Sequence, residues 1–165
     1  MLINFEKILN NLSKILVDKN LKLSLCESCT GGLLSKICTD YSGSSRWFLG
    51  SVVTYSNDMK EIMGVSKETL EKYGAVSKNT AQEMSLATLA FTNSDICLSI
   101  TGVAGPLGGS YKKPVGTVYF SYSDKYGSNI VKKIIFKGSR KEIRYLAAKE
   151  GIQIILDCAT DIKTQ

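Results

Sequence analysis

The sequence predicts a single-domain α/β fold: a three-layer α/β/α sandwich around a mixed, mostly parallel sheet. Short apolar segments of strand length alternate with longer segments whose apolar residues recur at helical spacing, which is typical of a sheet covered by helices. The 165 residues are 44% hydrophobic and include only two prolines, so one domain over residues 1–165 can bury a substantial core. In such folds ligands bind beyond the carboxyl ends of the parallel strands.

The first part of the chain predicts two helices and two strands. Residues 4–18 repeat apolar side chains at helical spacing between polar ones, which indicates an amphipathic helix rather than a signal peptide. An apolar strand is expected over 21–26 and a helix over 31–39. After a polar turn over 41–46, a second strand is predicted over 51–55.

The rest of the chain continues the alternation. Asn57 is positioned to cap a short helix over 58–63, and Ser66 opens another that ends near Tyr73, where Gly74 stops it. The remaining elements are a helix over 77–91, a strand over 95–101, a hairpin of strands over 115–123 and 129–136, and a closing helix over 139–159. One strand of the hairpin is expected to be the antiparallel member of the sheet.

The charge of +6 is concentrated in one region of the chain. Between Lys112 and Arg144 there are nine lysines and arginines against two acidic residues. A solvated basic face explains such a region, and an anionic ligand is the more specific interpretation. Nucleic acid is the least favoured partner, because the aromatic residues there alternate with small ones as in a packed strand. No apolar segment approaches membrane-spanning length, and we expect a cytoplasmic protein.

Cysteine and histidine usage narrows the chemistry. Five cysteines without a secretory signal indicate free thiols in a reducing compartment. Cys26 and Cys29 form a C-x-x-C pair, so thioredoxin-like redox chemistry is an alternative. Zinc is disfavoured, because there is no second C-x-x-C and no histidine, and no metal is predicted. The absence of histidine also means that any general base is a lysine, a carboxylate, a tyrosine or the terminal amine.

The segment LCESCTGG, residues 25–32, carries the strongest chemical signal. It places Ser28 and Cys29 where a predicted strand gives way to a helix, so their side chains are expected at the edge of the fold. The backbone amides of such a turn are free to bind an oxyanion or a phosphate, as in nucleophilic hydrolases and nucleotide sites. The alternative is structural, with Ser28 or Thr30 capping the helix that follows.

Two further strand ends are expected to lie beside this turn. Tyr55 ends the second strand, and Lys60 follows about one turn into the short helix. A lysine kept neutral by burial can act as base for a serine, although most lysines on helices face solvent. The glycine-rich loop TGVAGPLGG, residues 101–109, can form an anion-binding nest or simply a turn.

Six sequence blocks, taken in order, resemble those of the CinA C-terminal domain family. They are ESCTGG (27–32), GSSRWF (43–48), VVTYSNDMK (52–60), GAVS (74–77), TGVAGPLGG (101–109) and KPVGTVYF (113–120). The resemblance covers nearly the whole chain. It implies the stand-alone form of the family, whose characterised members are nicotinamide-nucleotide amidohydrolases. The chain departs from the family pattern in places: Leu107 and Ser139, and Tyr111 and Lys112 before the KP pair, replace residues that are usually acidic, and Cys26 stands where alanine is common.

The resemblance also implies an activity and a set of site residues. The expected reaction is hydrolysis of the carboxamide of nicotinamide mononucleotide, with Ser28 as nucleophile, Lys60 as base and Tyr55 as an assisting hydroxyl, in a homo-oligomer without cofactor or metal. The residues expected to bind substrate are Glu27, Cys29, Thr30, Gly31, Ser45, Thr101, Gly102, Gly105 and Arg140. The alternatives are a non-catalytic nucleotide-binding module, a redox protein that uses the C-x-x-C pair, and a DNA-binding accessory protein.

Overall fold

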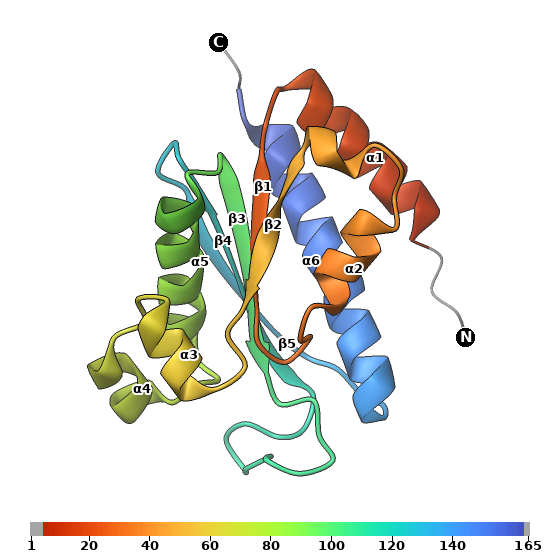
Figure 1. Ribbon diagram of the computed structural model, residues 1–165. Coiled ribbons are helices and arrows are strands. Elements are labelled where there is room, and N and C mark those ends of the chain that lie inside the picture. Colours follow the sequence, from red (N-terminus) through yellow and green to blue (C-terminus); the bar gives the residue numbers. More distant parts are fainter. Residues whose placement is uncertain (1–4, 164–165) are drawn as a thin grey trace.

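A computed structural model describes residues 5–163, which form five strands and six α-helices (Figure 1). In chain order the elements are α1 (Glu6–Asp18), β1 (Leu23–Glu27), α2 (Leu33–Thr39), the 3₁₀ turn η1 (Ser44–Arg46), β2 (Phe48–Val53), α3 (Asn57–Ile62), α4 (Lys67–Tyr73), α5 (Lys78–Thr92), β3 (Ile96–Gly102), β4 (Thr117–Asp124), β5 (Asn129–Ile135) and α6 (Arg140–Asp161). Among these helices, none is long and apolar enough to cross a membrane.

The five strands form one mixed sheet in the order β2-β1-β3-β4-β5. β1 pairs in parallel with both β2 and β3, whereas β4 is antiparallel to both β3 and β5. Only β4 therefore runs against the other four strands, and the predicted mixed, mostly parallel sheet is confirmed. Figure 1 shows α1, α2 and α6 on one face of the sheet and α3, α4 and α5 on the other, which confirms the three layers.

The two faces of the sheet are packed differently. The main hydrophobic cluster lies between the sheet and the layer of α1, α2 and α6, and it includes Leu12, Leu25 and Phe120. Beneath α5 a small apolar cluster around Met84 is joined by hydroxyl groups: Ser85 Oγ lies 2.9 Å from Ser121 Oγ and 2.7 Å from Ser123 Oγ. These buried hydroxyls satisfy one another, so the layer under α5 is held by hydrogen bonds as well as by apolar contact.

Several predicted boundaries shift in ways that matter for the site. The second strand ends at Val53, so Tyr55 lies in the loop beyond it. The cap of α3 is Ser56 rather than Asn57, because Ser56 Oγ accepts a hydrogen bond of 3.1 Å from the Met59 amide. The predicted start of the first helix, Asn4, lies outside the described residues.

Candidate active site

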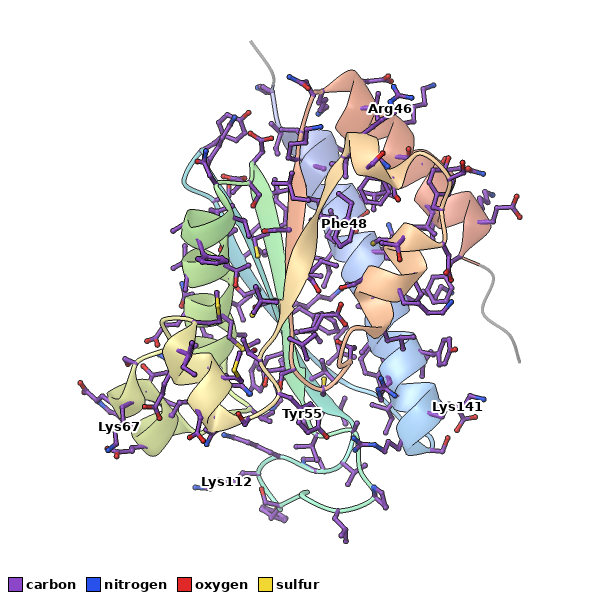
Figure 2. The ribbon with its side chains drawn as sticks, viewed as in Figure 1. Arg46, Phe48, Tyr55, Lys67, Lys112 and Lys141 are labelled. Atoms are coloured by element: carbon purple, nitrogen blue, oxygen red, sulfur yellow. The ribbon has the colours of Figure 1, made fainter. Side chains whose placement is uncertain are left out.

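A cavity of about 260 Å³ lies at the carboxyl ends of β1 and β3, where parallel strands were expected to place the site. Its walls come from the turn after β1, the loop after β2, the α4–α5 connection, the end of β3 and the start of α6. The predicted site residues that line it are Ser28, Cys29, Tyr55, Lys60, Thr101, Gly102 and Arg140. In Figure 2, Tyr55, Lys112 and Lys141 mark this end of the molecule, and Arg46 marks the opposite end.

Lys60 and Ser28 are in direct contact inside this cavity. The Nζ of Lys60 lies 3.1 Å from Ser28 Oγ and donates to the carbonyl oxygens of Thr54 (2.7 Å) and Tyr55 (3.3 Å). The cap at Ser56 starts α3 immediately after β2, which brings Lys60 back over the strand end. Both side chains are buried, Lys60 with 1% of its surface exposed. Burial lowers the pKa of Lys60, because removal from water disfavours the charged ammonium.

Glu27 has a different position from the one that the resemblance implies. Its carboxylate is fully buried and accepts hydrogen bonds from the amides of Gly32 (3.1 Å), Leu34 (3.1 Å) and Ser35 (2.8 Å), and from Ser35 Oγ (2.5 Å). These amides belong to the start of α2, where a negative charge is stabilising. Glu27 therefore anchors the turn from β1 to α2 and does not line the cavity, so its role in substrate binding stays a prediction.

The hydrogen bonds of this turn leave two amides available. The amide of Ser28 donates to β3, and that of Gly31 donates to the Ser28 carbonyl at 3.1 Å. The amides that follow are held by Glu27 or, at residue 33, by the Thr30 carbonyl. Within residues 28–35, only the amides of Cys29 and Thr30 have no hydrogen-bond acceptor. The free amides that the sequence predicts for this turn are therefore those of Cys29 and Thr30.

Tyr55 and Arg140 are joined at the rim of the cavity. Arg140 donates to the Tyr55 hydroxyl at 3.0 Å and to the Gly105 carbonyl at 2.8 Å. The Tyr55 side chain is 60% exposed, and no hydrogen bond links its hydroxyl to Ser28 or Lys60 within the described residues. Arg140 is the first residue of α6, which Ser139 caps in a reciprocal pair with Glu142. Ser139 therefore fixes the start of the helix that carries Arg140.

Thr101 and two glycines shape the cavity through the backbone. The Thr101 hydroxyl donates to the Ala75 carbonyl at 2.7 Å and so ties the end of β3 to the α4–α5 connection. A Cβ atom at Gly102 would lie 2.7 Å from the Thr117 carbonyl oxygen, and one at Gly105 would lie 2.4 Å from a Val115 methyl carbon. Only glycine therefore fits at these two positions of the loop, although Gly105 itself does not line the cavity.

Ser45 does not line this cavity. It belongs to η1, immediately before β2, and Phe48 at the start of β2 pairs with Leu23 at the start of β1. Ser28 follows the other end of β1. The parallel register therefore separates Ser45 from Ser28 by about 13 Å of strand or more. Thr30 and Gly31 belong to the turn but do not line the cavity.

Other contributors to the site were not among the predicted site residues. Ala75 and Val76 line the cavity, and the block GAVS that contains them was the available signal. Arg144 donates to the Thr30 carbonyl, so that α6 supports the turn behind Ser28. Arg144 follows Arg140 by four residues, so both arginines lie on one face of α6, and this spacing could have predicted that both face the site. The Thr54 carbonyl that holds Lys60 carries no sequence signal, because every residue has one.

The C-x-x-C cysteines are poorly suited to redox chemistry. Both are buried, and burial raises the pKa of Cys26 and raises that of Cys29 to about 12. A reactive cysteine needs the opposite shift, because the thiolate is the nucleophile. Among residues 5–163, no group of three or more cysteine, aspartate or glutamate side chains is arranged to hold a metal ion.

Comparisons with known proteins agree with this architecture. The model of the CinA C-terminal domain matches residues 5–159. Nicotinamide-nucleotide amidohydrolase PncC from Enterobacter agglomerans is 46% identical over 156 residues, which are 92% of this chain and 95% of that protein. A CinA-like protein from Syntrophomonas wolfei is 46% identical over 151 residues, 91% of this chain, and the match spans only 36% of that longer protein.

Solved structures of similar proteins superpose on nearly the whole chain. Competence damage-inducible protein A (ComA) from Klebsiella pneumoniae superposes with a TM-score of 0.93 at 28% identity, covering 98% of this chain and 100% of that one. Competence/damage inducible protein CihA from Agrobacterium tumefaciens superposes with a TM-score of 0.90 at 33% identity, covering 98% and 100%.

Proposed function

The chain belongs to the CinA C-terminal domain family, and from this premise we propose that it is a nicotinamide-nucleotide amidohydrolase that serves pyridine nucleotide recycling. The proposed reaction converts nicotinamide mononucleotide and water to nicotinate mononucleotide and ammonia. The likeness to PncC over 95% of that protein's length supports this substrate. The contact between Lys60 and Ser28 in a cavity at the strand ends carries the proposal, because it supplies a base for a nucleophile in a site without histidine.

The first step needs Ser28 to lose its proton as it attacks the amide carbon. A neutral Lys60 amine can donate to the carbonyls of Thr54 and Tyr55 while its lone pair faces Ser28 Oγ at 3.1 Å. That arrangement uses both N–H groups of the amine and leaves only the lone pair for the serine proton. The lowered pKa of Lys60 favours this neutral state, and it raises the fraction of enzyme able to react near neutral pH.

The tetrahedral intermediate needs donors for its oxyanion. The amides of Cys29 and Thr30, the two without acceptors in the turn, are the proposed donors. Removal of one such donor in other hydrolases costs about 10²–10³ in turnover. The C–N bond then breaks, and the Lys60 ammonium returns a proton to the departing ammonia. Water attacks the resulting Ser28 ester with Lys60 again as base, and this releases the nicotinate nucleotide and restores the serine.

The substrate phosphate is proposed to bind at the basic rim of the cavity. Arg140 is the first candidate, because arginine can contact a phosphate through two N–H groups at once. In this structure its donors bind the Gly105 carbonyl and the Tyr55 hydroxyl, so a phosphate would replace one of these partners. Release of Tyr55 would free its hydroxyl to approach the reacting amide, which is how its predicted assisting role becomes possible.

The proposal also covers the metal requirement, the location and the oligomeric state of the enzyme. The enzyme is proposed to need no metal, to act in the cytoplasm, and to form a homo-oligomer. The Ser–Lys pair supports the first of these, because it provides both nucleophile and base within one chain.

Ammonia release from nicotinamide mononucleotide tests the proposal. The purified protein should release ammonia from the mononucleotide but not from free nicotinamide, which lacks the phosphate and ribose. Ser28→Ala should abolish release while leaving the circular dichroism spectrum unchanged. Binding of the mononucleotide without ammonia release would instead support a non-catalytic nucleotide-binding module.

A further inference from the structure

The turn that carries Ser28 has an irregular backbone. Residues 28–32 lie between β1 and α2, so neither the sheet ladder nor the helix fixes their conformation beyond the Ser28 amide. Gly31 and Gly32 both have positive φ, 56° and 90°, in a conformation that glycine readily leaves. The amides proposed to bind the oxyanion, those of Cys29 and Thr30, lie just before these glycines. Their orientation therefore depends on the side chains that hold the turn.

Two side chains hold this turn at different points. Glu27 accepts hydrogen bonds from three amides at its α2 end. Arg144 donates from Nη2 to the Thr30 carbonyl oxygen at 2.5 Å. In the described part of the chain, this is the only hydrogen bond that joins residues 29–31 to a side chain. Figure 1 shows α6 beside α2 in the same layer, which is how the first turns of α6 reach this segment.

The two anchors carry opposite charges. Glu27 is fully buried, and a carboxylate so close to the site opposes a second negative charge on the oxyanion. Arg144 adds a positive charge to the same segment and offsets this repulsion. The Cys29 thiol, in the cavity wall, is close to both. Burial is the main cause of its raised pKa; of the neighbouring charges, Glu27 raises this pKa, whereas Arg144 lowers it more than Lys60 does.

Arg144 and Arg140 occupy different places at the site. Arg140 lines the cavity, and its hydrogen bonds go to the rim, to Gly105 and Tyr55. Arg144 lies about one helical turn further along α6 and does not line the cavity. Its hydrogen bond goes to the backbone of the turn. Arg144 can therefore act on the reacting atoms only through that backbone, as a positioning residue.

We propose that Arg144 positions the oxyanion-binding turn and supplies the positive charge that the turn needs. Its guanidinium fixes the Thr30 carbonyl, which orients the amides of Cys29 and Thr30 toward the oxyanion. Its charge offsets that of Glu27 when the tetrahedral intermediate forms. Arg144 thus stabilises the intermediate much more than the bound substrate. This inference rests on the serine chemistry of the proposed function, but not on the identity of the substrate.

Phenylboronic acid is the probe, because it mimics the tetrahedral intermediate without turnover. Ser28 Oγ adds to the boron while the serine proton passes to Lys60, and no group leaves. The boron becomes tetrahedral and negatively charged, with one of its hydroxyl oxygens at the oxyanion position. Boron nuclear magnetic resonance distinguishes this adduct from the free trigonal acid. A titration of the full chain at neutral pH therefore gives the Kd of the adduct, and Ser28→Ala should form none.

Two substitutions of Arg144 separate its charge from its packing. Arg144→Met keeps an aliphatic side chain but removes the charge and the hydrogen bond, and it should weaken the adduct by about ten- to a hundredfold. Arg144→Lys keeps a charged donor, and it should bind the probe at least about fivefold more tightly than Arg144→Met. Arg144→Gln replaces Arg144→Met if the latter does not fold. Lys149→Gln, which removes an exposed charge from the same helix, is the matched control and should bind as the wild type does.

The outcomes keep this inference apart from the proposed function, which ammonia release tests separately. Equal affinity of the wild type and Arg144→Met, equal losses in Arg144→Met and Arg144→Lys, or no saturable adduct in the wild type would each overturn the role of Arg144, even in a protein that releases ammonia. An adduct that depends on Arg144, in a protein that releases no ammonia from the mononucleotide, would support the inference and refute the proposed substrate.

Discussion

Glu27→Gln should both destabilise the protein and slow catalysis, although Glu27 does not line the cavity. The carboxylate accepts four hydrogen bonds from the start of α2, two on each oxygen. Glutamine keeps one oxygen and replaces the other by an NH₂ group, which is a donor. The less costly orientation turns this NH₂ toward Ser35, whose hydroxyl can rotate to accept, but the Ser35 amide then faces another donor.

The expected cost can be worked out from these bonds. One hydrogen bond to a charged group, about 1.5–3 kcal/mol, is lost at the Ser35 amide, and the remaining bonds lose their charge assistance. A total near 3 kcal/mol follows for a fully buried group. For a domain of this size, each kcal/mol lowers Tm by about 2–4 °C, so Tm should fall by about 6–12 °C. Because Ser28 and the two free amides belong to the anchored turn, kcat should fall at least tenfold.

Calorimetry and ammonia release together measure the two effects. Ser35→Ala is the matched control for catalysis, because it removes the hydroxyl bonds to Glu27 and Ser51 but leaves all three amide bonds to the charged carboxylate. It should cost about 1.5–3 kcal/mol, as for one bond to a charged group, and leave kcat close to that of the wild type. The acidic limb of the pH profile should stay in place in Glu27→Gln, since Lys60 is untouched. A Glu27→Gln protein with the Tm and kcat of the wild type would refute the anchoring role.

The other predictions concern the cavity itself. Lys60→Arg should be nearly as inactive as Lys60→Ala, because arginine does not lose its proton in proteins. Since only the neutral amine accepts the serine proton, wild-type kcat/KM should rise with pH through an apparent pKa below 10.5, and this limb describes the coupled site. Arg140→Ala should raise KM for the mononucleotide by about ten- to a hundredfold, and an unchanged KM would exclude Arg140 as the phosphate ligand. Replacing both Cys26 and Cys29 by alanine should leave ammonia release intact, and a total loss of activity would favour redox chemistry. EDTA should not inhibit; inhibition reversed by one divalent metal would contradict the Ser–Lys mechanism.

The sequence could predict which strand ends lie together, because this follows from the order of the strands along the chain and from their parallel direction. Ser28 lies in the turn after the first strand and Lys60 in the helix after the second, so the two were expected to lie together. Lys60 Nζ is 3.1 Å from Ser28 Oγ. Ser45 lies away from the cavity, and a sequence block gives no direction along the sheet from which this could be predicted. The parallel register of β1 and β2 decides that question, and it sends the start of β2 to the far end.

Residue type also cannot say which way a polar side chain points at a strand end. Glu27 belongs to a block expected at the substrate, yet it points to the start of α2. The acidic residue just before a helix was a usable signal for this. The face of α5 was similarly hard to predict, since its buried positions include Thr80, Ser85 and Thr88, which apolar periodicity does not detect.

Trapping the covalent intermediate tests the Ser–Lys mechanism most directly. If Ser28 attacks the carboxamide, rapid acid quenching during turnover should yield protein carrying the mononucleotide minus ammonia, as an ester. Peptide mapping by mass spectrometry should place this ester on Ser28, and Ser28→Ala should give neither adduct nor ammonia. An adduct on Cys29, or undiminished ammonia release by Ser28→Ala, would contradict the mechanism.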